Sequence, residues 1–387
     1  MRISRRLIAL VLVFLIPAAA LACLWDSETL KQERSRFPST LELITGKFLR
    51  HSPAFYEWRI KDRQEKLKTD PKNVGYYDDI AVSYEKIGQH DKAIETILAK
   101  EEIQPGLYET YSNLGTFYIL AGDFEKGLPY IDKALAINPD AHFGREKYQK
   151  WLVEYAMTRM KDGKLVFPMS YKPDYSENAP PNSFAEFVAS RLGKTQLNED
   201  EAKSAITGVL GMMRFANHKN PLLLEALANL LTDCDRPEQD AKQLAARALL
   251  QASYVVEDPQ AKAKYRALAK AALEMQTSHR VPELEAEFTK ELADAEVWYA
   301  ALEKQELDWI RQGGDVEARF DRLYSEEPTA LTIPEPETLL ERVIGSRRQG
   351  LNPIPLMAAL VIVVGIVGTT MWWRWSHRKR SIAAKQL

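Results

Sequence analysis

The feature that most constrains the fold is a repeat of 34 residues in the N-terminal half of the chain. The stretch DIAVSYEKIGQHDKAIETILAKEEIQP (79–105) is followed, in the same register, by NLGTFYILAGDFEKGLPYIDKALAINP (113–139). Like residues occupy eight paired positions: Tyr77 and Tyr111, Ile80 and Leu114, Ala81 and Gly115, Tyr84 and Tyr118, Gly88 and Gly122, Ala93 and Gly127, Ile97 and Ile131, and Pro105 and Pro139. A period of this length indicates a repeat architecture in which each copy is one supersecondary unit.

Each copy of the pattern predicts two helices joined by a turn. The paired glycines at 88 and 122 supply the turn, and the paired prolines at 105 and 139 end the second helix. Small residues at 81, 93, 115 and 127 let the two helices of a hairpin approach closely, while the paired isoleucines and tyrosines fill the space between hairpins. Because one hairpin cannot bury its apolar face alone, we expect the copies to stack into a superhelix.

This pattern resembles the tetratricopeptide repeat family, whose members are α-solenoids of helical hairpins. The second copy is the closer match, with the family's residues at Leu114, Gly115, Tyr118, Ala134 and Pro139. The first copy departs at Lys100, where the family usually has alanine. The resemblance covers residues 74–139, with weaker copies on either side, and implies an all-α fold. The lack of convincing two-residue alternation favours the same fold class.

The resemblance also implies a binding surface. Repeats of this family hold a peptide or a helix in a concave groove lined by their first helices. Carried over to this chain, the side chains expected to point into that groove are Glu109, Asn113, Thr116, Lys147 and Lys150. Some members clamp a C-terminal carboxylate, and the corresponding positions here are Asp78, Val82, Asn113, Phe143 and Lys147. Only Asn113 and Lys147 agree in type, and Asp78 would repel a carboxylate. The implied partner is therefore a protein or peptide, and ordinary solvated positions are the alternative interpretation.

Beyond the first repeats the chain is expected to continue as helices. Residues 141–160 repeat the first-helix pattern and are interpreted as the solvating cap of the array, which places the repeat domain at 23–161. Four prolines between 168 and 181 predict a linker at 162–182. A second all-α domain, built of eroded repeats or of unrelated helices, is predicted at 183–324.

The second domain carries its own start and stop signals. Asn198 and Glu201 predict a helix that begins with a capping box. Residues 222–231 and 240–253 are expected to pair as two helices, and a helix starting at Pro282 is expected to end before Gly313-Gly314. A stalk is predicted at 325–353.

The first 22 residues have the layout of a secretory signal peptide, with three arginines, an apolar core and then small residues. Cleavage before Cys23 is expected, and an uncleaved anchor helix is the alternative. Cys23 also admits lipidation, although only Ala22 and Cys23 match the usual lipobox. The only other cysteine, Cys234, either pairs with Cys23 or is a buried, inert thiol.

The C-terminal end predicts one transmembrane helix at 354–373. No ionisable residue occurs from Leu356 to Trp373, and this stretch spans about 27 Å as a helix, close to the thickness of a bilayer's hydrocarbon core. The basic tail at 374–387 follows directly and predicts a cytoplasmic C-terminus. We therefore expect a single-pass membrane protein whose body lies on the extracytoplasmic side, either periplasmic or extracellular.

The charge of the body argues against one class of partner. The two terminal segments hold eight of the 52 basic residues and no acid, which leaves 44 basic residues against 54 acids elsewhere. Nucleic acid binding needs concentrated Lys and Arg, so no nucleic acid partner is expected.

No motif for catalysis or metal binding is present. The sequence lacks H-E-x-x-H, C-x-x-C and G-x-S-x-G, and no two of its six histidines lie three or four residues apart. We therefore expect no catalytic residues, metal or cofactor, and interpret the protein as a membrane-anchored, non-enzymatic scaffold of the cell envelope. The alternative is an enzyme or transport accessory protein with an unrecognised site in 198–324 that the repeats dock to partners.

Overall fold

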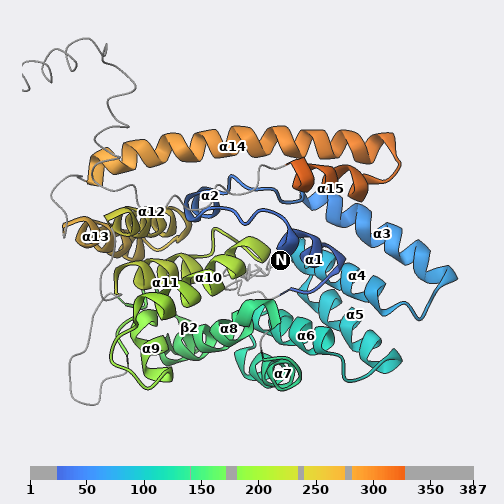
Figure 1. The fold of residues 1–387 in the computed structure, drawn as a ribbon, viewed down its shortest axis with the longest axis horizontal. Coiled ribbons are helices and arrows are strands. Elements are labelled where there is room, and N and C mark those ends of the chain that lie inside the picture. The colour runs from blue at the N-terminus through green and yellow to red at the C-terminus, as the bar shows by residue number, and fades with distance from the viewer. Residues whose placement is uncertain (1–23, 140, 171–180, 234–238, 275–280, 327–387) are drawn as a thin grey trace, which may run out of the picture. The chain divides into compact units, whose positions relative to one another are not determined.

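The computed structural model describes residues 24–139, 141–170, 181–233, 239–274 and 281–326. These residues belong to one compact unit and are mostly helical, as the sequence predicts (Figure 1). Outside them lie the predicted signal peptide (1–22), both cysteines (Cys23 and Cys234), the predicted transmembrane helix (354–373) and the tail (374–387). Within the described ranges, no helix combines the length and the apolar character needed to cross a membrane.

Most described helices pack on the next one along the chain and form a continuous array (Figure 1). Its first part consists of α3 (Pro53–Thr69), α4 (Val74–Lys86), α5 (His90–Ile103), α6 (Tyr108–Leu120), α7 (Phe124–Ile137) and α8 (Ala141–Thr158). Its second part consists of α9 (Phe184–Arg191), α10 (Glu199–Phe215), α11 (Pro221–Thr232), α12 (Gln239–Val255) and α13 (Pro259–Glu274). Four further helices pack on this array: α1 (Ser27–Arg34), α2 (Thr40–Thr45), α14 (Val281–Gln312) and α15 (Val316–Glu326).

The two copies of the repeat are the hairpins α4–α5 and α6–α7. Gly88 and Gly122 stand between the helices of each hairpin with φ of 74° and 85°, a conformation that favours glycine. Helices α6 and α7 cross very closely: a Cβ at Gly127 would lie 2.8 Å from the carbonyl oxygen of Gly115. A Cβ at Gly115 would in turn lie 2.5 Å from Cδ1 of Ile131. Glycine at both crossing positions therefore permits this contact.

One hydrophobic core runs through both predicted domains, including Leu152 of α8, Leu227 of α11 and Phe288 of α14. The segment expected to be a linker contributes to this core. Strands β1 (Met160–Lys161) and β2 (Lys164–Leu165) form a short antiparallel hairpin, and Met169 after it is buried. The boundary expected at 162–182 therefore does not separate two cores among the described residues. Residues 166–170, which include Pro168, are not helical, yet Met169 packs into the core.

The helix interpreted as a solvating cap, α8, is instead an interior element, and that interpretation was wrong. Tyr148, Leu152 and Tyr155 are almost fully buried. Helix α10 packs against α8, and a Cβ at Gly208 of α10 would lie 2.6 Å from the ring of Tyr148. The array does not end at α8, because the helices that follow cover the face that a cap would expose to solvent.

In the second half, α10 begins and α14 ends where the sequence predicts. Asn198 caps α10, and Glu201 completes the capping box as expected. Helices α11 and α12 pack on each other, and α14 ends at Gln312, before the two glycines. Of the predicted stalk at 325–353, the structure describes only the first two residues, which end α15.

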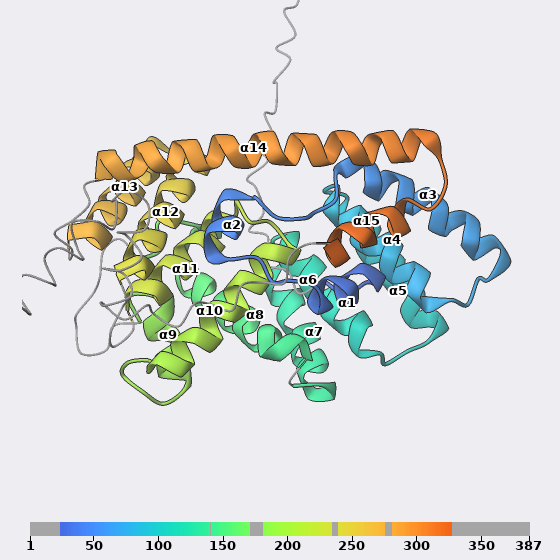
Figure 2. The ribbon, with the colours of Figure 1, turned by 45° about the horizontal axis from the view of Figure 1, so that its top comes forward.

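Helix α14 runs along the array from α12 and α13 to α3 (Figure 2). Arg247 of α12 donates two hydrogen bonds to Glu291 of α14, at 2.8 and 2.9 Å. Toward the other end of α14, Glu306 accepts a hydrogen bond from the backbone N–H of Ser52 at 2.8 Å. The sequence predicted this helix but not its contacts, which join the late and early parts of the array.

Candidate partner-binding groove

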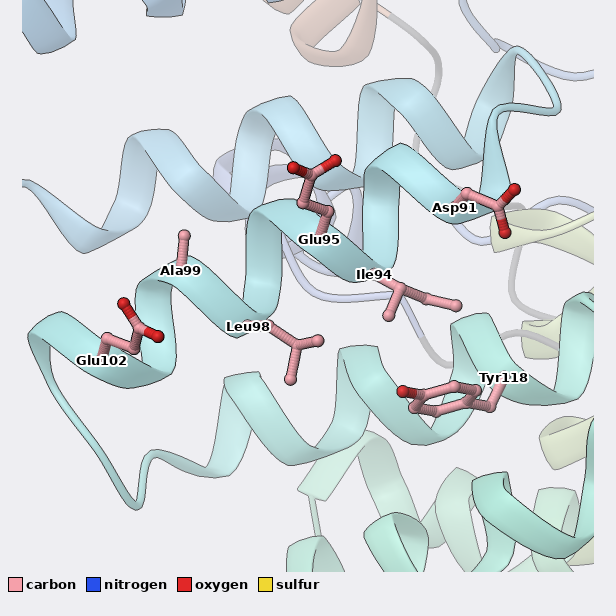
Figure 3. A pocket seen from close by; sticks show the side chains of 7 residues that line it. All are labelled: Asp91, Ile94, Glu95, Leu98, Ala99, Glu102 and Tyr118. Carbon is pink, nitrogen blue, oxygen red and sulfur yellow. The ribbon is translucent and has the colours of Figure 1, made fainter.

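Two surfaces of the repeat array are candidates for binding a partner. One is the side formed by α4 and α6, the first helices of the two repeats, where the resemblance implies a concave groove. The other is an open groove of about 460 Å³ between one face of α5 and Tyr118 of α6 (Figure 3). The polar contacts of the concave side decide whether it is open to a partner.

The concave groove is occupied by the chain's own residues 24–34, which we call the N-terminal segment. Leu24 and Asp26 are buried, at 2% and 4% exposed. Helix α1 begins at Ser27 because the Asp26 side chain accepts hydrogen bonds from the backbone N–H groups of Glu28 and Thr29. The segment therefore enters the groove as an extended chain and continues as a capped helix.

The side chain of Asn113, in α6, holds the backbone of Trp25. Its Oδ1 accepts a hydrogen bond from the Trp25 N–H, and its Nδ2 donates one to the Trp25 carbonyl, both at 2.9 Å. The Trp25 ring meets the Tyr108 ring edge to face, with 5.8 Å between centroids. Main-chain hydrogen bonds of this kind are how extended peptides are bound. A residue expected to bind a partner thus binds the protein's own N-terminal segment.

Asp78 and Lys100 both depart from the family pattern, and the two side chains form a buried ion pair. Lys100 is 1% exposed, and its Nζ donates to both carboxylate oxygens of Asp78, at 2.8 and 2.7 Å. Asp78 also accepts a hydrogen bond from Asn113 Nδ2 at 3.1 Å, which orients that amide. Burial raises the pKa of Asp78 to about 7, although Lys100 lowers it. Lysine stands where the family has alanine because a buried carboxylate is stabilised by a cation.

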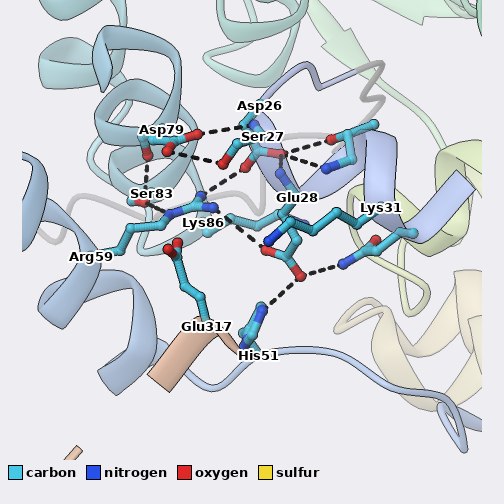
Figure 4. A network of polar contacts seen from close by, with 12 residues as sticks. Asp26, Ser27, Glu28, Lys31, His51, Arg59, Asp79, Ser83, Lys86 and Glu317 are labelled. Carbon is cyan, nitrogen blue, oxygen red and sulfur yellow. Dashed lines mark hydrogen bonds and ion pairs between the residues drawn. The ribbon is translucent and has the colours of Figure 1, made fainter. Parts of the chain in front are cut away.

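Charged side chains link the N-terminal segment to α3 and α4 (Figure 4). Arg59 is fully buried and donates to Asp26 at 2.8 Å and to the hydroxyl of Ser83 at 2.7 Å. Asp79 accepts hydrogen bonds from the backbone N–H and the hydroxyl of Ser27, both at 3.0 Å. Arg59 and Asp26 thus form a buried ion pair between the array and the segment, and removing Arg59 would leave the Asp26 carboxylate buried without this cation.

His51 joins the N-terminal segment to α14 and α15. Its Nε2 lies 2.7 Å from Glu28, and its Nδ1 is paired with Glu306. Its ring stacks on Phe55, with 3.5 Å between centroids, and lies 3.8 Å from the ring of Phe320. Burial lowers the pKa of His51, but the two carboxylates outweigh it and raise this pKa to about 9. His51 is therefore an imidazolium at neutral pH.

The contact with His51 also changes the pKa of Glu28. Burial raises the pKa of this carboxyl, but His51 and Arg59 outweigh burial and lower the pKa to about 2. Glu28 is therefore ionised over the whole physiological range.

Residues 108–141, which contain α6 and α7, match the tetratricopeptide repeat family. This segment is a tetratricopeptide repeat. The match confirms the resemblance inferred from the sequence. No curated protein and no solved structure gives a match to the chain.

Four other residues were predicted to face the groove of the tetratricopeptide repeat. Thr116 is buried and accepts a hydrogen bond from Gln149 Nε2 at 3.1 Å. Lys150 pairs with an aspartate of α7, and the Nζ of Lys147 lies 4.8 Å from the centroid of a tyrosine ring on α8. Glu109 is half-buried on α6. A partner-binding role for these residues stays a prediction.

The side chains of α4 and α6 that meet the N-terminal segment, Asp79 and Asn113 among them, are buried and hydrogen-bonded to it. In the described part of the chain, no three or more His, Cys, Asp or Glu side chains are grouped so that they could hold a metal ion. Neither the N-terminal segment nor Arg59 and His51, which hold it in place, was predicted from the sequence.

Proposed function

We propose that the protein is a non-enzymatic scaffold that binds protein partners through its helical array while a C-terminal helix holds it at a membrane. The observation that carries this proposal is the tetratricopeptide repeat at residues 108–141 within a continuous array of helices. Arrays of this kind present extended surfaces to other proteins and need no catalytic group to do so.

The membrane attachment rests on the sequence. The apolar stretch at 354–373, followed by the basic tail at 374–387, supports a single span with a cytoplasmic C-terminus. The signal-peptide layout of residues 1–22 supports an extracytoplasmic body, either periplasmic or extracellular.

The buried polar cluster around Glu225 in the second half does not support an enzymatic site. Glu225 of α11 is fully buried and accepts hydrogen bonds from the hydroxyl of Tyr265 at 2.7 Å and the backbone N–H of Ser170 at 2.8 Å. The pKa of Glu225 is raised above its ordinary value, because burial outweighs the opposing effect of these hydrogen bonds. Because the carboxylate is closed to solvent and hydrogen-bonded, its evident role is to hold the loop after β2 against α11 and α13.

The proposal is tested by crosslinking the full-length protein in intact cells and identifying the linked peptides by mass spectrometry. We expect the same partner protein to be linked reproducibly to lysines of the array. Deleting the repeats would remove part of the shared core, so exposed single residues are the better places to perturb binding. Failure to recover any reproducible protein partner would contradict the scaffold function.

The topology has a separate test. A protease added outside spheroplasts should digest the body while leaving an epitope on the 374–387 tail protected. Protection of the whole chain would contradict an extracytoplasmic body.

A further inference from the structure

The open groove along α5, introduced with Figure 3, lies on the helix face opposite its buried residues. Ala93 and Ile97 of α5 are fully buried in the array. The groove-lining residues of the same helix are Asp91, Ile94, Glu95, Leu98, Ala99 and Glu102. Their spacing places them on one continuous face along the helix. The groove is thus separate from the concave side that the N-terminal segment fills.

The floor of this groove is apolar. Ile94 and Leu98 lie over Tyr118 of α6, which forms part of the lining (Figure 3). Leu98 is 41% exposed, so its side chain is accessible to a partner. A second hollow, of about 390 Å³, adjoins the groove at Asp91 and reaches the turn at Gly88; His90 and Lys92 also line it. The two hollows together follow the full length of α5, about 20 Å for a helix of this size.

The rim of the groove is acidic. Asp91, Glu95 and Glu102 are exposed, and none of them forms an ion pair with another described residue. Asp91 and Glu95 are four residues apart, a spacing at which like charges destabilise a helix. Lys92, three residues from Glu95, instead lies 5.4 Å from the centroid of the Tyr84 ring. A cationic side chain of a partner would relieve the repulsion between Asp91 and Glu95.

We propose that the outer groove of α5 binds a basic amphipathic helix of another protein. Its apolar side chains would insert between Leu98 and Tyr118, and flanking Lys or Arg side chains would meet the acidic rim. This is the helix-in-groove mode, in which apolar anchors recur every three or four residues. The length of the groove fits a helix of about four turns. This inference rests on the proposed scaffold function and names its docking surface and the chemistry of the partner.

The test places a photo-reactive benzoylphenylalanine at Ala99 of the full-length protein in cells. Ala99 is exposed, so the replacement does not enter the core. The same residue at Val297 of α14, which is 74% exposed, is the matched control. We expect capture from position 99, and not from position 297, of one segment that carries net positive charge and apolar residues in helical spacing.

The second part of the experiment reverses the charge of the rim. The double variant Glu95→Lys/Glu102→Lys should lower the yield of this crosslink about tenfold, because attraction becomes repulsion at two exposed sites. The matched double variant Asp294→Lys/Glu296→Lys, on the exposed side of α14, should leave the yield unchanged. All four changes are at exposed positions, so the melting temperature should stay that of the unmodified chain.

Several results would overturn the inference. The inference fails if the captured segment is neutral or acidic. It also fails if the segment comes from a second copy of this chain or from its own tail, or if charge reversal leaves the crosslink yield unchanged. Absence of capture at position 99, while lysine crosslinking in the same cells recovers a partner, would also overturn it and leave the scaffold function standing. If neither method recovered a protein partner, the scaffold function itself would fail.

Discussion

Replacing His51 with glutamine removes the titratable group that joins Glu28 to Glu306. The two carboxylates raise the folded-state pKa of His51 from its ordinary value of 6.5 to about 9. Since one unit corresponds to about 1.4 kcal/mol, the imidazolium contributes about 3 kcal/mol to the free energy of unfolding. The contribution is fully present below pH 6.5, where the group is protonated in both states. It is lost as the pH rises through 9, where the folded protein also releases the proton.

The assay is urea unfolding of the full-length chain in mild detergent, followed by tryptophan fluorescence, at about pH 6, 7.5 and 9. Between the first and last of these, the unmodified protein should lose about 3 kcal/mol of unfolding free energy relative to His51→Gln. At about pH 6 the variant should be less stable by about 3 kcal/mol, because two buried carboxylates lose their cation. Equal pH slopes for the two proteins would refute the reasoning.

A matched control is His90→Gln. His90 also pairs with a carboxylate, Glu85, at 2.8 Å, but its side chain is 34% exposed. Solvent weakens such a pair, so this variant should change the pH slope by much less.

Two further predictions use the same unfolding assay. Lys100→Ala should lower the free energy of unfolding by about 3 kcal/mol, because Asp78 loses its buried cation. Adding Asp78→Asn should recover part of that loss, and an unchanged loss would contradict the pairing. Gly127→Ala should destabilise by about 2 kcal/mol, because the new methyl group would lie 2.8 Å from the carbonyl oxygen of Gly115. Gly75→Ala, at an exposed site of α4, should instead stabilise by up to about 1 kcal/mol, and equal effects of the two glycine changes would contradict a close helix crossing.

Local structure was predictable wherever its cause is local. The hairpins follow from a period of 34 residues with glycine at each turn, and the start of α10 follows from the capping box of Asn198 and Glu201. The end of α14 follows from the two glycines after Gln312. In each case the deciding residues lie within a few positions of the feature that they determine.

The occupant of the concave groove was not predictable in the same way. The contact between Trp25 and Asn113 joins residues 88 positions apart, and the contact between His51 and Glu306 joins residues 255 positions apart. No periodicity in the sequence reports such pairings. One signal was present: Asp78 and Lys100 both break the family pattern, and a charge that faces a groove needs a partner. These two residues indicate that the groove differs from that of the family, but they do not identify the segment that fills it.

The two corrections have a common physical cause. The end of α8 and the prolines after it were interpreted as the edge of a domain, because helix formation stops there. Packing does not stop there, since Met169 is buried and its backbone N–H donates to Glu225 at 3.1 Å. Local rules determine where a helix ends, whereas burial against distant helices determines where a core ends.

The central claim, that the N-terminal segment occupies the concave groove, is tested most directly by hydrogen exchange at the backbone amides of residues 24–34 in the full-length chain. The Trp25 and Ser27 amides donate to Asn113 and Asp79, at 2.9 and 3.0 Å. They should therefore exchange at least about a hundredfold more slowly than in an unstructured peptide. In Asn113→Ala, the Trp25 amide should exchange at least about tenfold faster than in the unmodified chain. Exchange of these amides at the rate of an unstructured peptide in the unmodified chain would contradict the claim.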